Sequence, residues 1–377
     1  MRCVAVCGGD VQNILPSNQS LRTVEIDGLP MTFGLITVGD PIFDKKDPRN
    51  ARRVLVRVKA FSCNYRDKSL IFGAMQGATG NSFYPLGSEF VGEVIDVGPE
   101  VASFKVSDRV MGDNCYLGTQ VSENGIRGGI PTNHASKEYQ IFQESKLIHV
   151  PESMSDRCAA CFSIGYQTVY SIIRKLNVEP GANVLVTSAK SNTSIFAIQA
   201  LKKLNVNVYA LTSSGRHRQE LQWMGVKELI EVKLEGADIN LSTDDVSRHA
   251  SGLGEVISMM QGFDYVVDPF FDVYLSLALK ILKAGGKYAT CGLTGLQLDA
   301  ALPTVTEVFA VSALNNFQLI FNCLGLRQDL EDALNDFKAG MIKVIIDSVH
   351  GGSRVDDFFH RTFTATDRFG KVVYEYN

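Results

Sequence analysis

The stretch from Asn183 to Leu211, NVLVTSAKSNTSIFAIQALKKLNVNVYAL, decides the fold of this chain. It opens with the apolar run Val184–Val186, which is typical of a short strand buried on both faces. After a run of small polar residues, apolar residues recur every three positions from Ile195 to Leu204, which predicts a helix with one buried face. A second strand, Val206 to Ala210, closes the unit. This order predicts a right-handed crossover whose helix N-terminus offers backbone N–H groups to a pyrophosphate.

The turn inside this unit lacks the glycines of the G-x-G-x-x-G dinucleotide fingerprint. Its small residues allow a ligand to approach closely, provided that φ stays negative. We take its polar residues as candidate phosphate-binding groups: Ser188, Lys190, Ser191, Asn192 and Thr193. A helix N-cap rich in Ser and Thr explains the same residues equally well.

Length and composition exclude several classes of protein. A chain of 377 residues is long enough for two domains, and its 45% hydrophobic content predicts a globular fold. The net charge of −4 is spread without blocks of like charge, so we expect no nucleic-acid partner, and no apolar run approaches the length of a membrane span. The N-terminal residues lack the pattern of a secretory signal, and the eight cysteines are scattered, so a cytoplasmic protein is expected.

Strands and helices alternate from about residue 166 to residue 326. The pattern predicts an α/β domain with a doubly wound sheet of six parallel strands. We expect residues 1–165 and 327–377 to form a separate domain, to which the chain returns through a helix ending at Gly340 and through the strands IKVIID and KVVYEY.

Motifs in the first part of the chain are specific enough to suggest a family. They are S-x-N-Y-R-D from Ser62, P-L-G-S-E-F from Pro85 and F-K-V-S-D-R-V from Phe104. This series resembles the GroES-like catalytic domain of the medium-chain dehydrogenase/reductase superfamily. SKEYQIF, QTVYSII, LKAGGKYATCGL and RFGKVVYEY follow in the order of that superfamily, and the last resembles its zinc-free quinone reductase branch. The resemblance covers nearly the whole chain. It implies a mostly-β GroES-like domain, a Rossmann nucleotide domain and an active site in the cleft between them.

The positions of the superfamily's catalytic zinc ligands carry other residues here. Where zinc-dependent relatives have Cys, His and Cys, this chain has Asn64, Ser88 and Ile164. An amide, a hydroxyl and a hydrocarbon do not make a Zn²⁺ site. Residues 113–137 contain only Cys115, so the four-cysteine structural lobe is also missing, and Cys158-x-x-Cys161 has no second pair. We therefore predict an enzyme without a metal.

Without a Lewis acid, an alcohol is difficult to deprotonate near neutral pH. Reduction of an activated C=C bond is easier, because the enolate that forms needs only a hydrogen-bond donor or a proton. The resemblance thus implies reduction of an enone, a quinone, an enoyl thioester or a dehydroamino acid, so the substrate is a small molecule or a peptide. A nucleotide-binding protein without turnover is an alternative, which the glycine-free turn motivates, and a zinc-type alcohol dehydrogenase is a weaker one.

The candidate catalytic residues are Tyr65, Asn64 and Asp67. The Tyr65 phenol could donate a hydrogen bond or a proton to the enolate, or it could line the cleft. Asn64 could donate an amide N–H to a carbonyl oxygen, or it could fix its loop. Asp67 is expected to tie this loop to a basic partner such as Arg368 or Lys371.

Charge at the end of the second nucleotide-domain strand indicates the cofactor. The stretch Thr212–Gly215, which includes Ser213, lacks the acid that NAD enzymes usually carry there, and Arg216 and Arg218 follow it. Hydroxyl and guanidinium groups favour a 2′-phosphate, so we expect NADPH. Alternatively, the two arginines only face solvent on the next helix.

The resemblance implies three further contacts. It places Thr168 and the Cys291–Gly292 backbone against the nicotinamide ring. It also implies a homodimer through the last nucleotide-domain strand, NNFQLIF.

Overall fold

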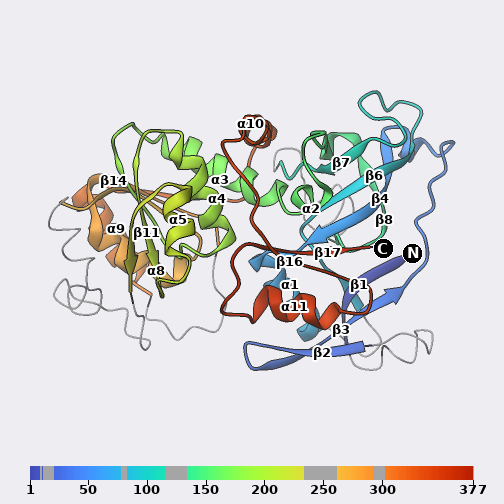
Figure 1. Cartoon of the computed structure of the whole chain (residues 1–377), viewed down its shortest axis with the longest axis horizontal. Helices are drawn as coiled ribbons and strands as arrows, with labels where there is room; N and C mark the ends of the chain where they lie inside the picture. Colours follow the sequence, from blue (N-terminus) through green and yellow to red (C-terminus); the bar gives the residue numbers. More distant parts are fainter. Residues whose placement is uncertain are drawn as a thin grey trace. The chain divides into compact units, whose positions relative to one another are not determined.

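The computed structural model describes residues 1–8, 11, 21–77, 83–115, 134–232, 261–292 and 302–376 (Figure 1). The chain divides into two compact units. The first comprises residues 1–164 and 344–377, and the second comprises residues 165–343.

The second unit confirms the predicted doubly wound sheet. Among its described residues, six strands pair in parallel in the order β12-β11-β10-β13-β14-β15. Their bounds are β10 Asn183–Val186, β11 Asn207–Thr212, β12 Val226–Glu231, β13 Phe263–Asp268, β14 Leu282–Thr290 and β15 Gln318–Phe321. The order reverses beside β10, and a ligand in such a sheet binds at the carboxyl ends of the strands next to that reversal.

Helices cover both faces of this sheet (Figure 1). On one side lie α4 (Asn192–Lys202) and α5 (Arg218–Met224), and on the other lie α8 (Phe271–Ile281) and α9 (Val305–Asn315). The predicted helix after the turn is α4, and its residues from Ser194 to Leu201 are all buried. A helix enclosed to this extent fixes the turn that precedes it, because the turn cannot move without disturbing the core.

The second unit ends later than the sequence predicted. The helix α10 (Arg327–Lys338) packs on α3 (Ser163–Leu176), where Asp329 pairs with Arg174 at 2.7 Å. Asp336 likewise accepts a hydrogen bond from the Tyr170 hydroxyl. The unit therefore runs to residue 343 instead of 326. The predicted end of the helix is close, since Gly340 takes a φ of +73° two residues beyond it.

The first unit contains two sheets and three helices in its described residues. One sheet has the order β16-β17-β4-β6-β7-β9, with β8 also paired to β4, and the other has the order β2-β3-β1-β5. The strands are β1 Arg2–Cys7, β2 Leu21–Ile26, β3 Leu29–Thr37, β4 Arg53–Ser62, β5 Phe83–Pro85, β6 Glu89–Val97, β7 Arg109–Gly112, β8 Tyr139–Gln143, β9 Leu147–His149, β16 Ile346–Gly351 and β17 Lys371–Glu375. The helices are α1 Tyr65–Gly77, α2 Asp156–Ala159 and α11 Val355–Phe363.

The core of the first unit is aromatic where α11 packs on the strands. The Phe33 and Phe359 rings stack with centroids 3.9 Å apart, and Phe358 meets Phe61 edge to face. The predicted strand IKVIID, residues 342–347, lies too early in the chain, because β16 begins only at Ile346. In the parts of the chain that the structure describes, no helix has the length and apolar character needed to span a membrane.

Candidate functional site

In the first unit, the three positions that the resemblance assigns to zinc ligands lie close together. Asn64 follows β4, and its Nδ2 lies 3.3 Å from the Oγ of Ser88, just before β6. The backbone N–H of Ile164 donates to Oε2 of Glu89 at 3.1 Å. The predicted positions thus meet around the buried Glu89 carboxylate.

A buried ion pair lies at the centre of this cluster. Lys371, the first residue of β17, donates from Nζ to Oε1 of Glu89, and neither side chain has exposed surface. The same ammonium donates to Oδ1 of Asn64 at 2.7 Å, and the Ser62 hydroxyl donates to Glu89 at 2.9 Å. A positive charge is therefore built in beside the positions that the resemblance assigns to zinc ligands.

The Asn64 amide is fully engaged. An ammonium can only donate, so the amide oxygen must face Lys371 and the amide nitrogen must face the other way. Its two hydrogens go to Glu89, at 2.8 Å, and to Ser88, at 3.3 Å. This arrangement favours the loop-fixing alternative for Asn64 over donation to a substrate carbonyl.

Asp67 holds the start of α1 and does not have the basic partner that the sequence predicted. Its Oδ2 accepts from the backbone N–H of Asn64, at 2.7 Å, and from the Ser88 hydroxyl. This is one half of a capping box, in which the acidic side chain of the third helical residue accepts a hydrogen bond from the backbone N–H of the residue before the helix. The expectation was wrong because Lys371 pairs with Glu89 instead.

Burial raises the pKa of Asp67, in spite of the lowering effect of the Arg66 charge. Within the described part of the chain, Oδ1 of Asp67 has no hydrogen-bond partner. A carboxyl group in this setting is stabilised in its protonated form relative to water.

Tyr65 is the member of the predicted trio whose side chain reaches the surface. It is the first residue of α1 and is 37% exposed. Lys68, one turn later, donates from Nζ to the Tyr65 hydroxyl at 3.1 Å and also pairs with Asp27 in the β2–β3 turn. The phenol oxygen is the acceptor in this contact, so the contact does not use the phenol hydrogen. Sequence reasoning missed Lys68, although its i,i+3 spacing from Tyr65 on a helix was a usable signal.

In the second unit, the turn after β10 differs from the expected geometry. Ser188 has a φ of +47°, in the left-handed region that favours glycine, so the condition of negative φ is not met at this residue. The backbone N–H of Ala189 donates to Leu211, and that of Ser191 donates to Ser188. Ser191 caps α4 by accepting from the N–H of Ser194 at 3.2 Å, as the N-cap alternative predicted. Asn192 and Thr193 are the first residues of that helix.

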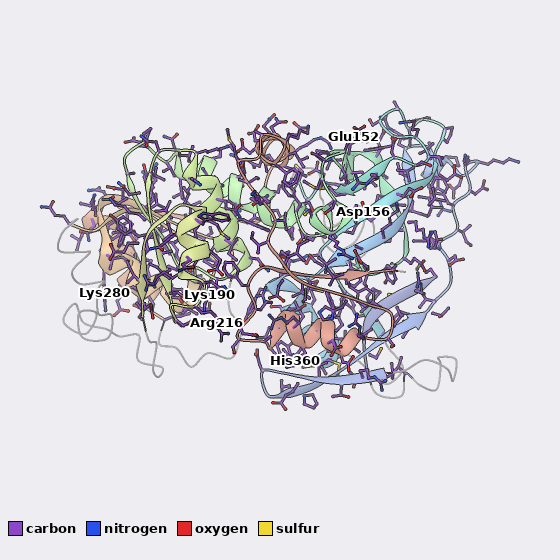
Figure 2. The ribbon with its side chains drawn as sticks, in the orientation of Figure 1. Glu152, Asp156, Lys190, Arg216, Lys280 and His360 are labelled. Carbon is purple, nitrogen blue, oxygen red and sulfur yellow. The ribbon has the colours of Figure 1, made fainter. Side chains whose placement is uncertain are left out.

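Three of the predicted phosphate-binding residues lie at one edge of the sheet: Lys190, Ser213 and Arg216. Lys190 donates from Nζ to the Ser214 hydroxyl at 2.8 Å. Burial lowers the pKa of Lys190, and the neighbouring charge of Arg216 acts in the same direction. Figure 2 shows Lys190 and Arg216 at the same end of this unit. Ser213 and Arg216 are exposed.

Arg218 has a partner that the sequence analysis did not consider. Its guanidinium donates to Oε1 of Glu231 at 2.6 Å and to the Leu229 carbonyl at 3.2 Å. It therefore lies against β12 and is not simply exposed on the next helix.

The carboxyl ends of β10, β13 and β14 are held together by a buried acid. Asp268 accepts from the Thr187 hydroxyl and from the Tyr288 hydroxyl, both at 2.6 Å. A Cβ at Gly292 would lie 2.8 Å from the Pro269 carbonyl oxygen, so the backbone after β14 needs glycine. Thr168 is nearly buried on α3.

The Cys291 thiol should react slowly with an alkylating reagent. Burial raises its pKa to about 12, so the thiolate fraction at pH 8 is about 10⁻⁴. Cys323, beyond β15, is exposed. We expect iodoacetamide at pH 8 to label Cys323 well before Cys291, as measured by peptide mass spectrometry, with urea-unfolded protein as the control. Faster labelling of Cys291 would contradict the burial of its thiol.

Comparison with known proteins identifies the architecture. Residues 50–152 match the alcohol dehydrogenase GroES-like domain. The crystal structure of an NAD-dependent alcohol dehydrogenase aligns with 100% of this chain and 99% of its own, with a TM-score of 0.71 and 22% identity. The chain has the fold of the medium-chain dehydrogenase/reductase superfamily.

Relatives in sequence support this superfamily. The acryloyl-coenzyme A reductase of Metallosphaera sedula is 26% identical over 340 residues, which cover 83% of this chain and 90% of the relative. A mycocerosic acid synthase-like polyketide synthase of Mycolicibacterium smegmatis is 25% identical over 251 residues. That match covers 66% of this chain, which spans only 10% of the synthase.

The residues at the positions that the resemblance assigns to zinc ligands do not fit a metal. The Asn64 oxygen faces an ammonium, and Ile164 offers a hydrocarbon side chain. Across the described ranges, no group of three or more His, Cys, Asp or Glu side chains is placed to hold a metal ion. Most of residues 113–137, where the four-cysteine lobe was sought, lies outside the described residues.

Proposed function

We propose that this chain is an NADPH-dependent reductase of an activated C=C bond and that it works without a metal. The observation that carries the proposal is the Asn64–Lys371–Glu89 cluster. An amide oxygen that accepts from an ammonium is not available to Zn²⁺, and the charge of Lys371 opposes a second cation in the same place. The position of the Lewis acid is thus occupied by a group that cannot act as one.

We assign to the first unit the donation of a proton to the substrate. When bound, the reduced nicotinamide supplies a hydride to the carbon β to the substrate carbonyl, and the C=C electron pair moves to form an enolate. Tyr65 donates a hydrogen bond to the enolate oxygen, or its proton to the α carbon. The Lys68 ammonium, 3.1 Å from the phenol oxygen, stabilises the negative charge that develops there as the proton leaves.

The second unit supplies the cofactor site. Lys190 and Arg216 provide positive charge, and Ser213 and Ser214 provide hydroxyl donors, at the carboxyl ends of β10 and β11. These groups suit the 2′-phosphate of NADPH. Thr168 and the Cys291–Gly292 backbone are proposed to contact the nicotinamide.

The substrate class that we favour is an enoyl thioester, because the acryloyl-coenzyme A reductase aligns over most of both chains. Enones, quinones and dehydroamino acids in peptides remain in the test panel because the same enolate chemistry serves them. We expect fluorescence titration to give a lower Kd for NADPH than for NADH. Oxidation of NADPH should then follow with acryloyl-coenzyme A. A chelator should leave that rate unchanged.

Two outcomes would contradict the proposal. An NADH Kd equal to or below that of NADPH would reject the cofactor assignment. Stoichiometric zinc that is lost together with activity on chelation would reject the metal-free mechanism.

A second candidate, a nucleotide-binding protein without turnover, is favoured by one observation. The N–H groups of Ala189 and Ser191 are already bonded inside the protein, so they are not available to a pyrophosphate. Binding of NADPH without oxidation by any member of the substrate panel would favour this candidate.

We also propose that two copies associate through β15. This strand lies at the end of the sheet order, and its Phe321 side chain is exposed. The neighbouring helix α9 exposes Val305, Phe309 and Leu314. Among the described strands, one edge of β15 has no partner, and such an edge beside exposed apolar side chains is the kind of surface that a second copy covers.

A further inference from the structure

A carboxylate stands beside the predicted 2′-phosphate site, although β11 itself ends without an acid. In the parallel pairing of β11 with β12, Thr212 lies opposite Glu231, so the last residues of the two strands are neighbours. The N–H of Val232 also donates to the Thr212 carbonyl at 2.8 Å, which fixes this register beyond Glu231. An acid thus stands at the end of the next strand, beside the position at which NAD enzymes usually carry theirs.

Glu231 is held in place by Arg218. Its Oε1 accepts from Arg218 at 2.6 Å, and both side chains are about half exposed. A Cβ at Gly215 would lie 2.3 Å from the same oxygen, so glycine leaves the space that the carboxylate occupies. The φ of Gly215 is not in the left-handed region, so the backbone conformation does not itself require glycine there. The lack of a side chain matters because Glu231 fills the space.

The same carboxylate acts on the rest of the cationic cluster. Its charge opposes the lowering of the Lys190 pKa that burial and Arg216 cause. Lys190, Arg216, Arg218 and Glu231 therefore form one electrostatic group at the ends of three adjacent strands. A 2′-phosphate that enters this group gains the cations but meets the carboxylate, whereas a ribose 2′-hydroxyl can donate to the carboxylate directly.

We propose that Glu231 sets the choice between NADPH and NADH, because it neutralises Arg218 and repels the 2′-phosphate. This inference rests on the proposed function, since it assumes that the second unit binds a nicotinamide cofactor. Glu231 limits the preference for NADPH that the cations alone would give, and it keeps NADH binding measurable.

The test is Glu231→Gln, which keeps the shape of the side chain and removes its charge. We expect the Kd of NADPH to fall about tenfold, the order expected for removal of one nearby like charge in a partly solvated site. The Kd of NADH should stay the same or rise. The matched control is Glu228→Gln, which makes the same change of charge on an exposed residue of β12 three positions earlier, and should leave both constants unchanged.

A second pair of probes separates this site from the nicotinamide end. Binding of 2′,5′-ADP should tighten in Glu231→Gln, whereas binding of 5′-AMP should not. Arg218→Met should weaken 2′,5′-ADP binding and leave 5′-AMP binding unchanged. An unchanged ratio of NADPH to NADH affinity in Glu231→Gln would overturn the role of Glu231 but not the proposed function. Failure of the unaltered protein to bind either cofactor would overturn the proposed function and this inference with it.

Discussion

Tyr65→Phe is expected to lower kcat by about 100-fold, the lower end of the range for loss of a general acid. The substitution removes the only acidic hydrogen of this side chain and keeps the ring, whose centroid lies 4.9 Å from the Lys68 ammonium. The packing of α1 should therefore survive. The measurement is steady-state oxidation of NADPH with the best substrate from the panel, together with the NADPH Kd from fluorescence titration.

The binding constant distinguishes loss of chemistry from loss of structure. Tyr65 belongs to the first unit and the proposed cofactor residues belong to the second, so the NADPH Kd should change by less than about twofold, well under the 1.4 kcal/mol of a tenfold effect. Tyr139→Phe is the matched control, since Tyr139 is a partly buried residue of β8 outside the cluster. If Tyr65→Phe turned over at the rate of the unaltered protein, Tyr65 would only line the site.

The sequence predicted the nucleotide unit well because its signals are local. A buried parallel strand reads as a continuous apolar run, and a helix reads as a three-residue apolar period, so β10, α4 and β11 follow from one short stretch. The expectation of one buried face was wrong for α4, because every residue from Ser194 to Leu201 is buried. The signals that set the limits of that unit along the chain are not local. α10 has an ordinary amphipathic pattern, and only contacts with distant residues, such as the pairing of Asp329 with Arg174, 155 residues away, show which core it covers.

The candidate site shows the same division between local and distant signals. Asn64 and Ser88 were expected at neighbouring ligand positions and lie 3.3 Å apart, but the role of Asn64 depends on Lys371, which is 307 residues away. No spacing rule predicts that an ammonium from the last strand will use the amide oxygen. Glu231 was missed for a related reason, since it approaches Thr212 through the sheet register and not through the sequence. Lys68 was within reach of sequence reasoning, one helical turn from Tyr65.

Lys371→Met should cost the first unit about 3–5 kcal/mol, the range for removing one partner of a buried ion pair. The cost comes mainly from Glu89, which would be left charged and enclosed with no cation beside it. The free energy of unfolding, measured by urea titration with circular dichroism, tests this expectation. The double variant Glu89→Gln with Lys371→Met should recover much of the loss, because no unpaired charge then remains.

An exposed pair on the neighbouring strands supplies the control. Lys59 on β4 and Glu93 on β6 are 2.7 Å apart, but each side chain is about one-third exposed. Lys59→Met should therefore cost only about 0–1 kcal/mol. Equal losses at Lys59 and Lys371 would show that burial does not set the strength of the inner pair. The fixed orientation of the Asn64 amide, and with it the argument against a metal at this position, would then lose its physical basis.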